Sequence, residues 1–145
     1  MRSSLQLSRE TMRNFGYRVV DMLVAHFDDL PEKPVTERTD RSPREQLHEP
    51  LPEKGMSPDD VLVQVEQDVF ANMMHVDHPR FLAFVSSPSN YVSAMADALT
   101  AGFNPFLGTW MEASGPTEVE LVTIDWLRQL CGLPEGAGGL FVSGG

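Results

Sequence analysis

Residues 138–145 constrain the fold of this chain more than any other stretch. They open with two glycines, continue as the apolar run 140–142 and end in the serine–glycine turn 143–145. Because the run is apolar on both faces, it is typical of a strand buried in a parallel sheet. A buried strand without neighbours leaves N–H and C=O groups unpaired, at about 1–3 kcal/mol each. The sequence therefore predicts that the partner strands come from elsewhere and that this chain is part of something larger.

The turn 143–145 also points to a binding role. Backbone N–H groups at a glycine turn after a strand can cradle a phosphate, and such a turn normally opens a helix. Here the sequence ends at Gly145 before any helix. From the residues alone, two interpretations stay open: a phosphate site and an ordinary tight turn, which is the commoner structure. We expect the chain to stop inside a functional site.

Helical patterns fill most of the chain before that stretch. Residues 8–30 predict a helix capped by Ser8, and Leu30-Pro31 ends it. A second helix is predicted to start at Ser57 and end near His75, because a cap, a proline and two acids open it. A third is expected over 89–103. The apolar faces of the first two helices are formed by Met12, Phe15, Val19, Met22, Leu23 and His26, and by Val61, Leu62, Val65, Val69 and Met73.

The fourth predicted helix begins at Ser114 or Thr117, since residues 117–120 fit the capping-box pattern Thr-x-x-Glu. Gly132 stands where a left-handed C-terminal residue belongs, and a proline follows two positions later. By contrast, five prolines break residues 31–56, which favours an extended arm lying on a surface; a disordered linker is the alternative. The buried stripe of the fourth helix is expected to be Val119, Val122, Trp126, Leu127 and Leu130.

Composition narrows the class of protein. The 145 residues suffice for one domain of ordinary size, and no run of about 18 apolar residues or secretory signal is present. The single cysteine, Cys131, fits a reducing cytoplasm, so we predict a cytoplasmic location. The net charge of −10 repels nucleic acid and anionic lipid, so neither nucleic acid nor a membrane is an expected partner.

Side chains that carry chemistry are few. Four histidines, His26, His48, His75 and His78, pair with no cysteine or acid at metal-ligand spacing, so no metal site is predicted. The two lysines, Lys33 and Lys54, both lie in the proline-broken arm. A Schiff-base lysine must sit desolvated in a pocket. We therefore expect this chain alone to hold no catalytic residue.

Several short motifs follow one another along the chain: His78-Pro79-Arg80-Phe81-Leu82-Ala83-Phe84, Asn104-Pro105, Thr117-Glu118-Val119-Glu120, Asp125-Trp126-Leu127, Gly132-Leu133-Pro134 and Phe141-Val142-Ser143-Gly144-Gly145. Their order resembles that in the pyridoxal-phosphate-dependent group II amino-acid decarboxylases, which include the aromatic-L-amino-acid decarboxylases. The resemblance covers about residues 8–145 and is specific from residue 78 onward. It implies an α/β fold: the N-terminal part of an aspartate-aminotransferase-like (type I) PLP fold, mostly helical here, with one strand at the C-terminal end.

The same resemblance implies an organisation and a set of site residues. Residues 1–88 would be helices and an arm that wrap the other subunit of an intertwined homodimer. Residues 89–145 would begin the large PLP-binding domain. Ser143, Gly144 and Gly145 match positions that bind the phosphate of pyridoxal 5′-phosphate. The implied substrate-binding residues are Phe84, Val85, Ser86 and Ser87, together with Phe106 and Trp110 approaching the neighbouring active site.

The implied reaction is loss of carbon dioxide from a small amino-acid substrate, expected to be aromatic, by way of an external aldimine. The ring of the cofactor accepts the electron pair. The lysine, histidine and aspartate of that active site lie beyond residue 145, so the resemblance also implies a partner: the C-terminal remainder of the enzyme on a second polypeptide. The alternative is a non-catalytic helical module that kept this region for dimerisation. The substrate, and decarboxylation as against oxidative deamination, stay open.

Overall fold

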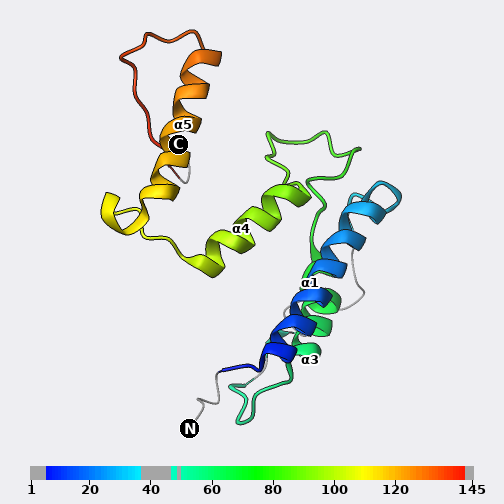
Figure 1. Cartoon of the computed structure of the whole chain (residues 1–145). Helices are drawn as coiled ribbons and strands as arrows, with labels where there is room; N and C mark the ends of the chain where they lie inside the picture. The colour runs from blue at the N-terminus through cyan, green and yellow to red at the C-terminus, as the bar shows by residue number, and fades with distance from the viewer. Residues whose placement is uncertain (1–5, 37–46, 49, 143–145) are drawn as a thin grey trace. The chain divides into compact units, whose positions relative to one another are not determined.

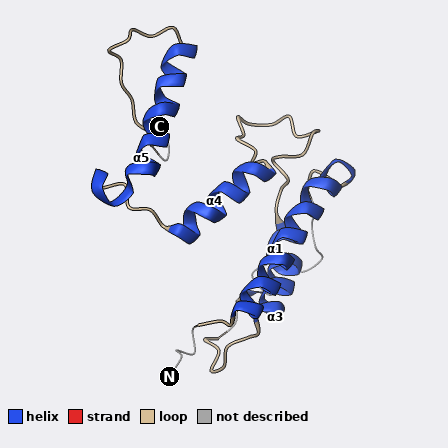
Figure 2. Cartoon of the chain, in the orientation of Figure 1, coloured by secondary structure: helices blue, strands red, loops and turns tan. Residues whose placement is uncertain are grey.

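The computed structural model describes residues 6–36, 47–48 and 50–142. Within these ranges the chain consists of helices joined by loops (Figures 1 and 2). It divides into two compact units, Met1–Ala94 and Met95–Gly145. The boundary between them falls inside the helix α4, Tyr91–Phe103. Each unit is described by itself below.

The first unit is built on α1, Arg9–Asp29, which begins as the sequence predicts. The Ser8 side chain accepts a hydrogen bond from the backbone N–H of Thr11 at 3.0 Å, which confirms the cap. At its other end α1 runs into a short 3-10 helix, η1, Leu30–Glu32. Leu30 is buried, but no residue within α1 is, so its apolar stripe is only partly covered.

The second helical run of this unit is longer than its α-helical part. It starts as α3, Pro58–Gln64, where the Ser57 side chain accepts from the N–H of Asp60 at 3.1 Å. It then continues as a π-helical turn, η2, Val65–Val69, and a 3-10 turn, η3, Phe70–Asn72. The start is confirmed, and the helical run ends close to the predicted His75. Figure 1 shows α3 beside α1, and an Arg18–Asp59 ion pair of 2.7 Å joins them.

The helix α4 confirms the third predicted helix almost residue for residue. The N–H of Ser93 donates to the Asn90 side-chain oxygen at 3.0 Å and holds the first turn. Beyond Phe103 the chain leaves the helix at Asn104, which has the left-handed φ of 45°. Asparagine tolerates that conformation better than most residues because its short side chain bonds locally.

The helix α5, Trp110–Leu130, begins earlier than expected. Its first turn is separated from the rest by a kink at Ala113 (φ −146°, ψ 46°), after which Pro116 stands in a first turn, where proline is tolerated. The prediction of a capping box at residues 117–120 is wrong, because the Thr117 hydroxyl is buried and makes no hydrogen bond among the described residues. The kink, not a cap, starts the long part of α5.

The C-terminal end of α5 confirms the prediction at Gly132, whose φ is 65°. Its N–H donates to the carbonyl of Gln129 at 3.1 Å, and the N–H of Leu133 to that of Arg128 at 3.0 Å, which is the Schellman pattern. In the last turns Arg128 donates to Asp125 at 2.7 Å. This hydrogen bond holds the pKa of the Asp125 carboxyl below its usual value.

The predicted strand at 140–142 is wrong. These residues form a loop, and no strand occurs among the residues that the structure describes; an isolated bridge pairs Thr36 with Met74. A strand exists only by pairing with a neighbour, and the described part of this chain supplies none. Instead the N–H of Phe141 donates to the Glu120 carboxylate at 3.3 Å, so the loop returns along α5.

Very little of the described chain is buried. The buried residues are Leu30, Leu62, Ala113, His75 and His78. Along α5 the stripe predicted to be buried is exposed, with Trp126 at 62%. Where the chain is described, no helix is both long and apolar enough to cross a membrane. Such exposed apolar faces are typical of helices that pack against a partner. The described residues do not supply that partner.

Candidate functional site

The candidate site starts at a tight turn that carries the motif His78-Pro79-Arg80-Phe81. The N–H of His78 donates to the carbonyl of His75 at 3.2 Å, and the N–H of Phe81 to that of His78 at 2.8 Å. Between them, the N–H of Arg80 donates to Nδ1 of the His78 ring at 2.9 Å. The His78 side chain is thus part of the turn, and His78 is only 3% exposed.

Contacts with distant segments fix the beginning of this turn. Nε2 of His26, on α1, lies 2.9 Å from a carboxylate oxygen of Asp77, which is mostly buried. The rings of His26 and His75 lie 5.8 Å apart. From the arm, the carbonyl of Val35 accepts the N–H of His75 at 2.8 Å, and Thr36 bridges to Met74. The turn is therefore anchored on two sides.

Beyond Phe81 the predicted substrate-binding residues lie together on an exposed loop. The rings of Phe81 and Phe84 lie 6.3 Å apart. Phe84 has a φ of 60°, which a bulky side chain rarely adopts and which costs about 1–3 kcal/mol. It is 88% exposed, and Val85 is exposed too. Ser86 donates weakly to the carbonyl of Val76 at 3.5 Å, and Ser87 is exposed.

The other two predicted substrate-binding residues, Phe106 and Trp110, belong to the second unit. Phe106 lies in the loop after α4, and Trp110 is the first residue of α5; both are more than half exposed. A Cβ at Gly108 would overlap the Phe106 ring, so glycine there lets the ring fold back over the backbone. The Phe106 ring thus lies against Gly108, although most of its side chain is exposed to solvent.

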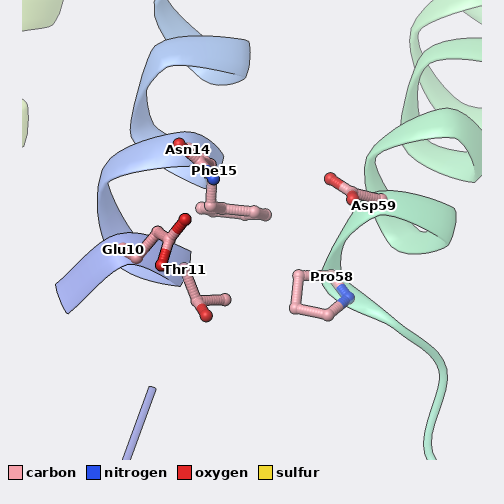
Figure 3. Close-up of a pocket in the computed structure, with 6 residues that line it drawn as sticks. All are labelled: Glu10, Thr11, Asn14, Phe15, Pro58 and Asp59. Atoms are coloured by element: carbon pink, nitrogen blue, oxygen red, sulfur yellow. The ribbon is translucent and has the colours of Figure 1, made fainter. Parts of the chain in front are cut away.

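The predicted phosphate-binding residues Ser143, Gly144 and Gly145 lie outside the described residues. An open pocket of about 300 Å³ lies between α1 and α3, where Phe15 points toward Pro58 and Asp59 (Figure 3). Its lining includes the carboxylates of Glu10 and Asp59, which repel a phosphate. This pocket is therefore unsuited to the phosphate of pyridoxal phosphate. Among the described residues, no three His, Cys, Asp or Glu side chains are grouped to hold a metal ion.

Both lysines lie in bends outside the helices. Lys33 follows η1, and its carbonyl accepts a long hydrogen bond of 3.4 Å from the Arg80 guanidinium. Lys54 is exposed in the loop before α3. Neither side chain lines the pocket between α1 and α3.

The sequence pattern does not reveal the role of the histidines. It predicts His26 on a helix face and indicates no site at His75 and His78. In the structure, 51 positions separate His26 from its partner Asp77, a pairing that no local pattern reveals. One signal was the histidine before Pro79: Asn, Asp, Ser and Thr side chains commonly accept a backbone N–H two residues on, and a histidine ring nitrogen can accept one too.

Comparison with known proteins gives the wider context. The model of the pyridoxal-dependent decarboxylase conserved domain matches residues 41–145. An aromatic-L-amino-acid decarboxylase of Bacillus atrophaeus is 47% identical over 146 aligned residues, which cover 100% of this chain. An L-tyrosine/L-DOPA decarboxylase of Lophophora williamsii is 28% identical over 89% of this chain. The chain spans 30% of the length of the first relative and 25% of the second.

Solved structures show the same relationship. Tryptophan decarboxylase of Catharanthus roseus, solved with L-tryptophan, superposes with a TM-score of 0.75 at 25% identity, covering 88% of this chain and 28% of that one. TDC of Oryza sativa, solved with PLP, superposes with a TM-score of 0.79 at 22% identity, covering 95% of this chain and 30% of that one. At this identity the similarity supports the fold alone. The predicted fold family, a portion of the type I PLP fold, is confirmed apart from its strand. The chain belongs to the pyridoxal-dependent decarboxylase family.

Proposed function

We propose that this chain is the N-terminal portion of a PLP-dependent decarboxylase that releases carbon dioxide from an aromatic amino acid. One observation carries the proposal: 47% identity along the whole chain to an aromatic-L-amino-acid decarboxylase. The chain works only together with the remainder of such an enzyme, within an intertwined homodimer, and in the cytoplasm. The physical support is the large uncovered apolar surface of α1 and α5, which a larger assembly would bury.

The residues of this chain bind and orient the substrate. Phe84, Val85, Ser86 and Ser87 line its side of the pocket, and Phe106 and Trp110 reach the neighbouring active site. Three of these side chains are aromatic, and aromatic rings pack well against an aromatic substrate. Ser143, Gly144 and Gly145 hold the phosphate of the cofactor, which supplies the electron-accepting ring. The proposed division keeps residues 1–88 for subunit wrapping and 89–145 for the start of the large domain.

A direct assay tests this function. The chain is produced together with the remainder of the enzyme, and carbon dioxide release is measured with and without added pyridoxal phosphate. Tryptophan, tyrosine, phenylalanine and DOPA are offered, with glutamate as the control substrate. We expect cofactor-dependent release from at least one aromatic amino acid and none from glutamate. Release from glutamate alone would contradict the aromatic assignment, and release from none would contradict the enzyme.

A non-catalytic dimerisation module is the second candidate. It is favoured by the position of Lys33 and Lys54 in bends of the chain, since neither side chain lines the pocket between α1 and α3. Native and denatured mass measurements on one sample separate the two functions. A second, larger chain in equal amount supports the enzyme. A homodimer of the 145-residue chain alone supports the module.

A further inference from the structure

The His78 ring adds a second hydrogen bond to a turn that the backbone closes between His78 and Phe81. Proline at 79 has no N–H, so the donors available after His78 begin with Arg80. The Arg80 N–H donates to Nδ1 of His78 at 2.9 Å, and the Phe81 N–H donates to the His78 carbonyl at 2.8 Å. One residue thus accepts two successive donors, one on its ring and one on its backbone.

The hydrogen bond to Nδ1 determines which nitrogen of the neutral ring carries the hydrogen. A nitrogen that accepts an N–H carries no hydrogen, so the neutral His78 ring bears its hydrogen on Nε2. Nε2 is buried and has no hydrogen-bond partner in the described structure. Nδ1 is therefore the ring atom that makes a hydrogen bond within the described structure, and the remainder of the ring fills buried space.

The turn is the last firmly held point before the exposed loop. Upstream, the Asp77–His26 pair and the His75–Val35 hydrogen bond hold it. Downstream, Phe84 takes its left-handed φ of 60° only three residues after Phe81, and its ring lies 6.3 Å from the Phe81 ring. The direction in which the chain leaves the turn therefore sets where Phe84 and Val85 are presented.

We propose that His78 is a positioning residue for the substrate pocket and acts through Nδ1. By accepting the Arg80 N–H, it aims the loop that carries Phe84, Val85, Ser86 and Ser87. This inference rests on the proposed function, because it assumes that these four residues face the substrate. His78 itself does not touch substrate; it sets the position of residues that do.

Two substitutions separate the acceptor from the bulk of the ring. In His78→Asn the amide oxygen can take the place of Nδ1, whereas in His78→Gln the amide lies one bond further out, near the place of Nε2. His48→Gln, at an exposed position, is the matched control. All are made in the complete PLP-loaded enzyme, and kcat, KM for its aromatic substrate and thermal unfolding are measured.

We expect His78→Asn and the control to keep KM within about twofold of the unsubstituted enzyme, and His78→Gln to raise it about tenfold, as for a lost hydrogen bond. The lost hydrogen bond should lower the unfolding temperature of His78→Gln by only a few degrees relative to His78→Asn, so both variants are folded in the assay. Equal KM values for the Asn and Gln variants, or a KM rise that follows only loss of stability, overturn the inference. An inactive unsubstituted enzyme overturns the proposed function, and this inference with it.

A measurement without substitution covers the case in which His78→Gln fails to fold. Nitrogen-15 shifts of the His78 ring in the enzyme distinguish a bare Nδ1 from a protonated one. We expect a bare Nδ1 and a protonated Nε2. A protonated Nδ1 overturns the inference even if the enzyme is fully active.

Discussion

At the scale of single residues, Asn104 shows how one backbone angle ends a helix. It follows α4 with a φ of 45°, and its N–H donates to the carbonyl of Thr100 at 2.8 Å. Asn104→Ala should lower the free energy of unfolding by about 1 kcal/mol, because a Cβ without local hydrogen bonding is strained there. Asn104→Gly should be nearly neutral. Urea unfolding of the complete enzyme measures both, and an Ala variant as stable as the Gly variant would contradict the strain.

Gly108 gives a second residue-scale prediction. Gly108→Ala should displace the Phe106 ring, because the new Cβ would overlap it, while the flexible side chain gives way at little cost in stability. If Phe106 helps to bind substrate, KM should change by about threefold to tenfold with kcat and unfolding temperature kept. Gly102→Ala, on α4 with open space around it, is the control. An unchanged KM for Gly108→Ala would remove Phe106 from the substrate site.

At the scale of elements, the His26–Asp77 pair ties α1 to the turn at residues 75–81. Asp77 is mostly buried, so Asp77→Ala should cost about 1.5–3 kcal/mol of unfolding free energy, as for hydrogen bonds to charged groups. The exposed Arg18–Asp59 pair is the comparison, and Arg18→Ala should cost about 1 kcal/mol or less. Chemical denaturation of the complete enzyme compares them. Equal costs would mean that the His26–Asp77 contact does not anchor the turn.

At the scale of the whole molecule, the described residues bury very little apolar surface, and we predict that the chain does not fold cooperatively alone. Only three apolar residues, Leu30, Leu62 and Ala113, are buried among those described. Stability must offset about 1–2 kcal/mol of conformational entropy per ordered residue. Produced alone, the 145-residue chain should show helical circular dichroism without a sharp thermal transition, and should bind a hydrophobic dye. A sharp transition in calorimetry would instead favour the self-sufficient dimerisation module.

Local signals in the sequence predicted the helices well. The caps at Ser8 and Ser57 and the left-handed Gly132 all appear where expected, because each depends on hydrogen bonds within a few residues. Thr117 is the exception: its pattern fits a capping box, yet the kink at Ala113 starts the long helix instead. A motif sets a preference, and the surrounding backbone decides whether it is used.

The sequence by itself determined where α1, α3 and α4 begin and where α5 ends, and through its motifs the family to which the chain belongs. Only the tertiary structure decided what depends on distant partners. It brought His26 to Asp77 across 51 positions and made the His78 ring part of a turn. It also left residues 140–142 as a loop, because a strand needs a neighbour with which to share its hydrogen bonds.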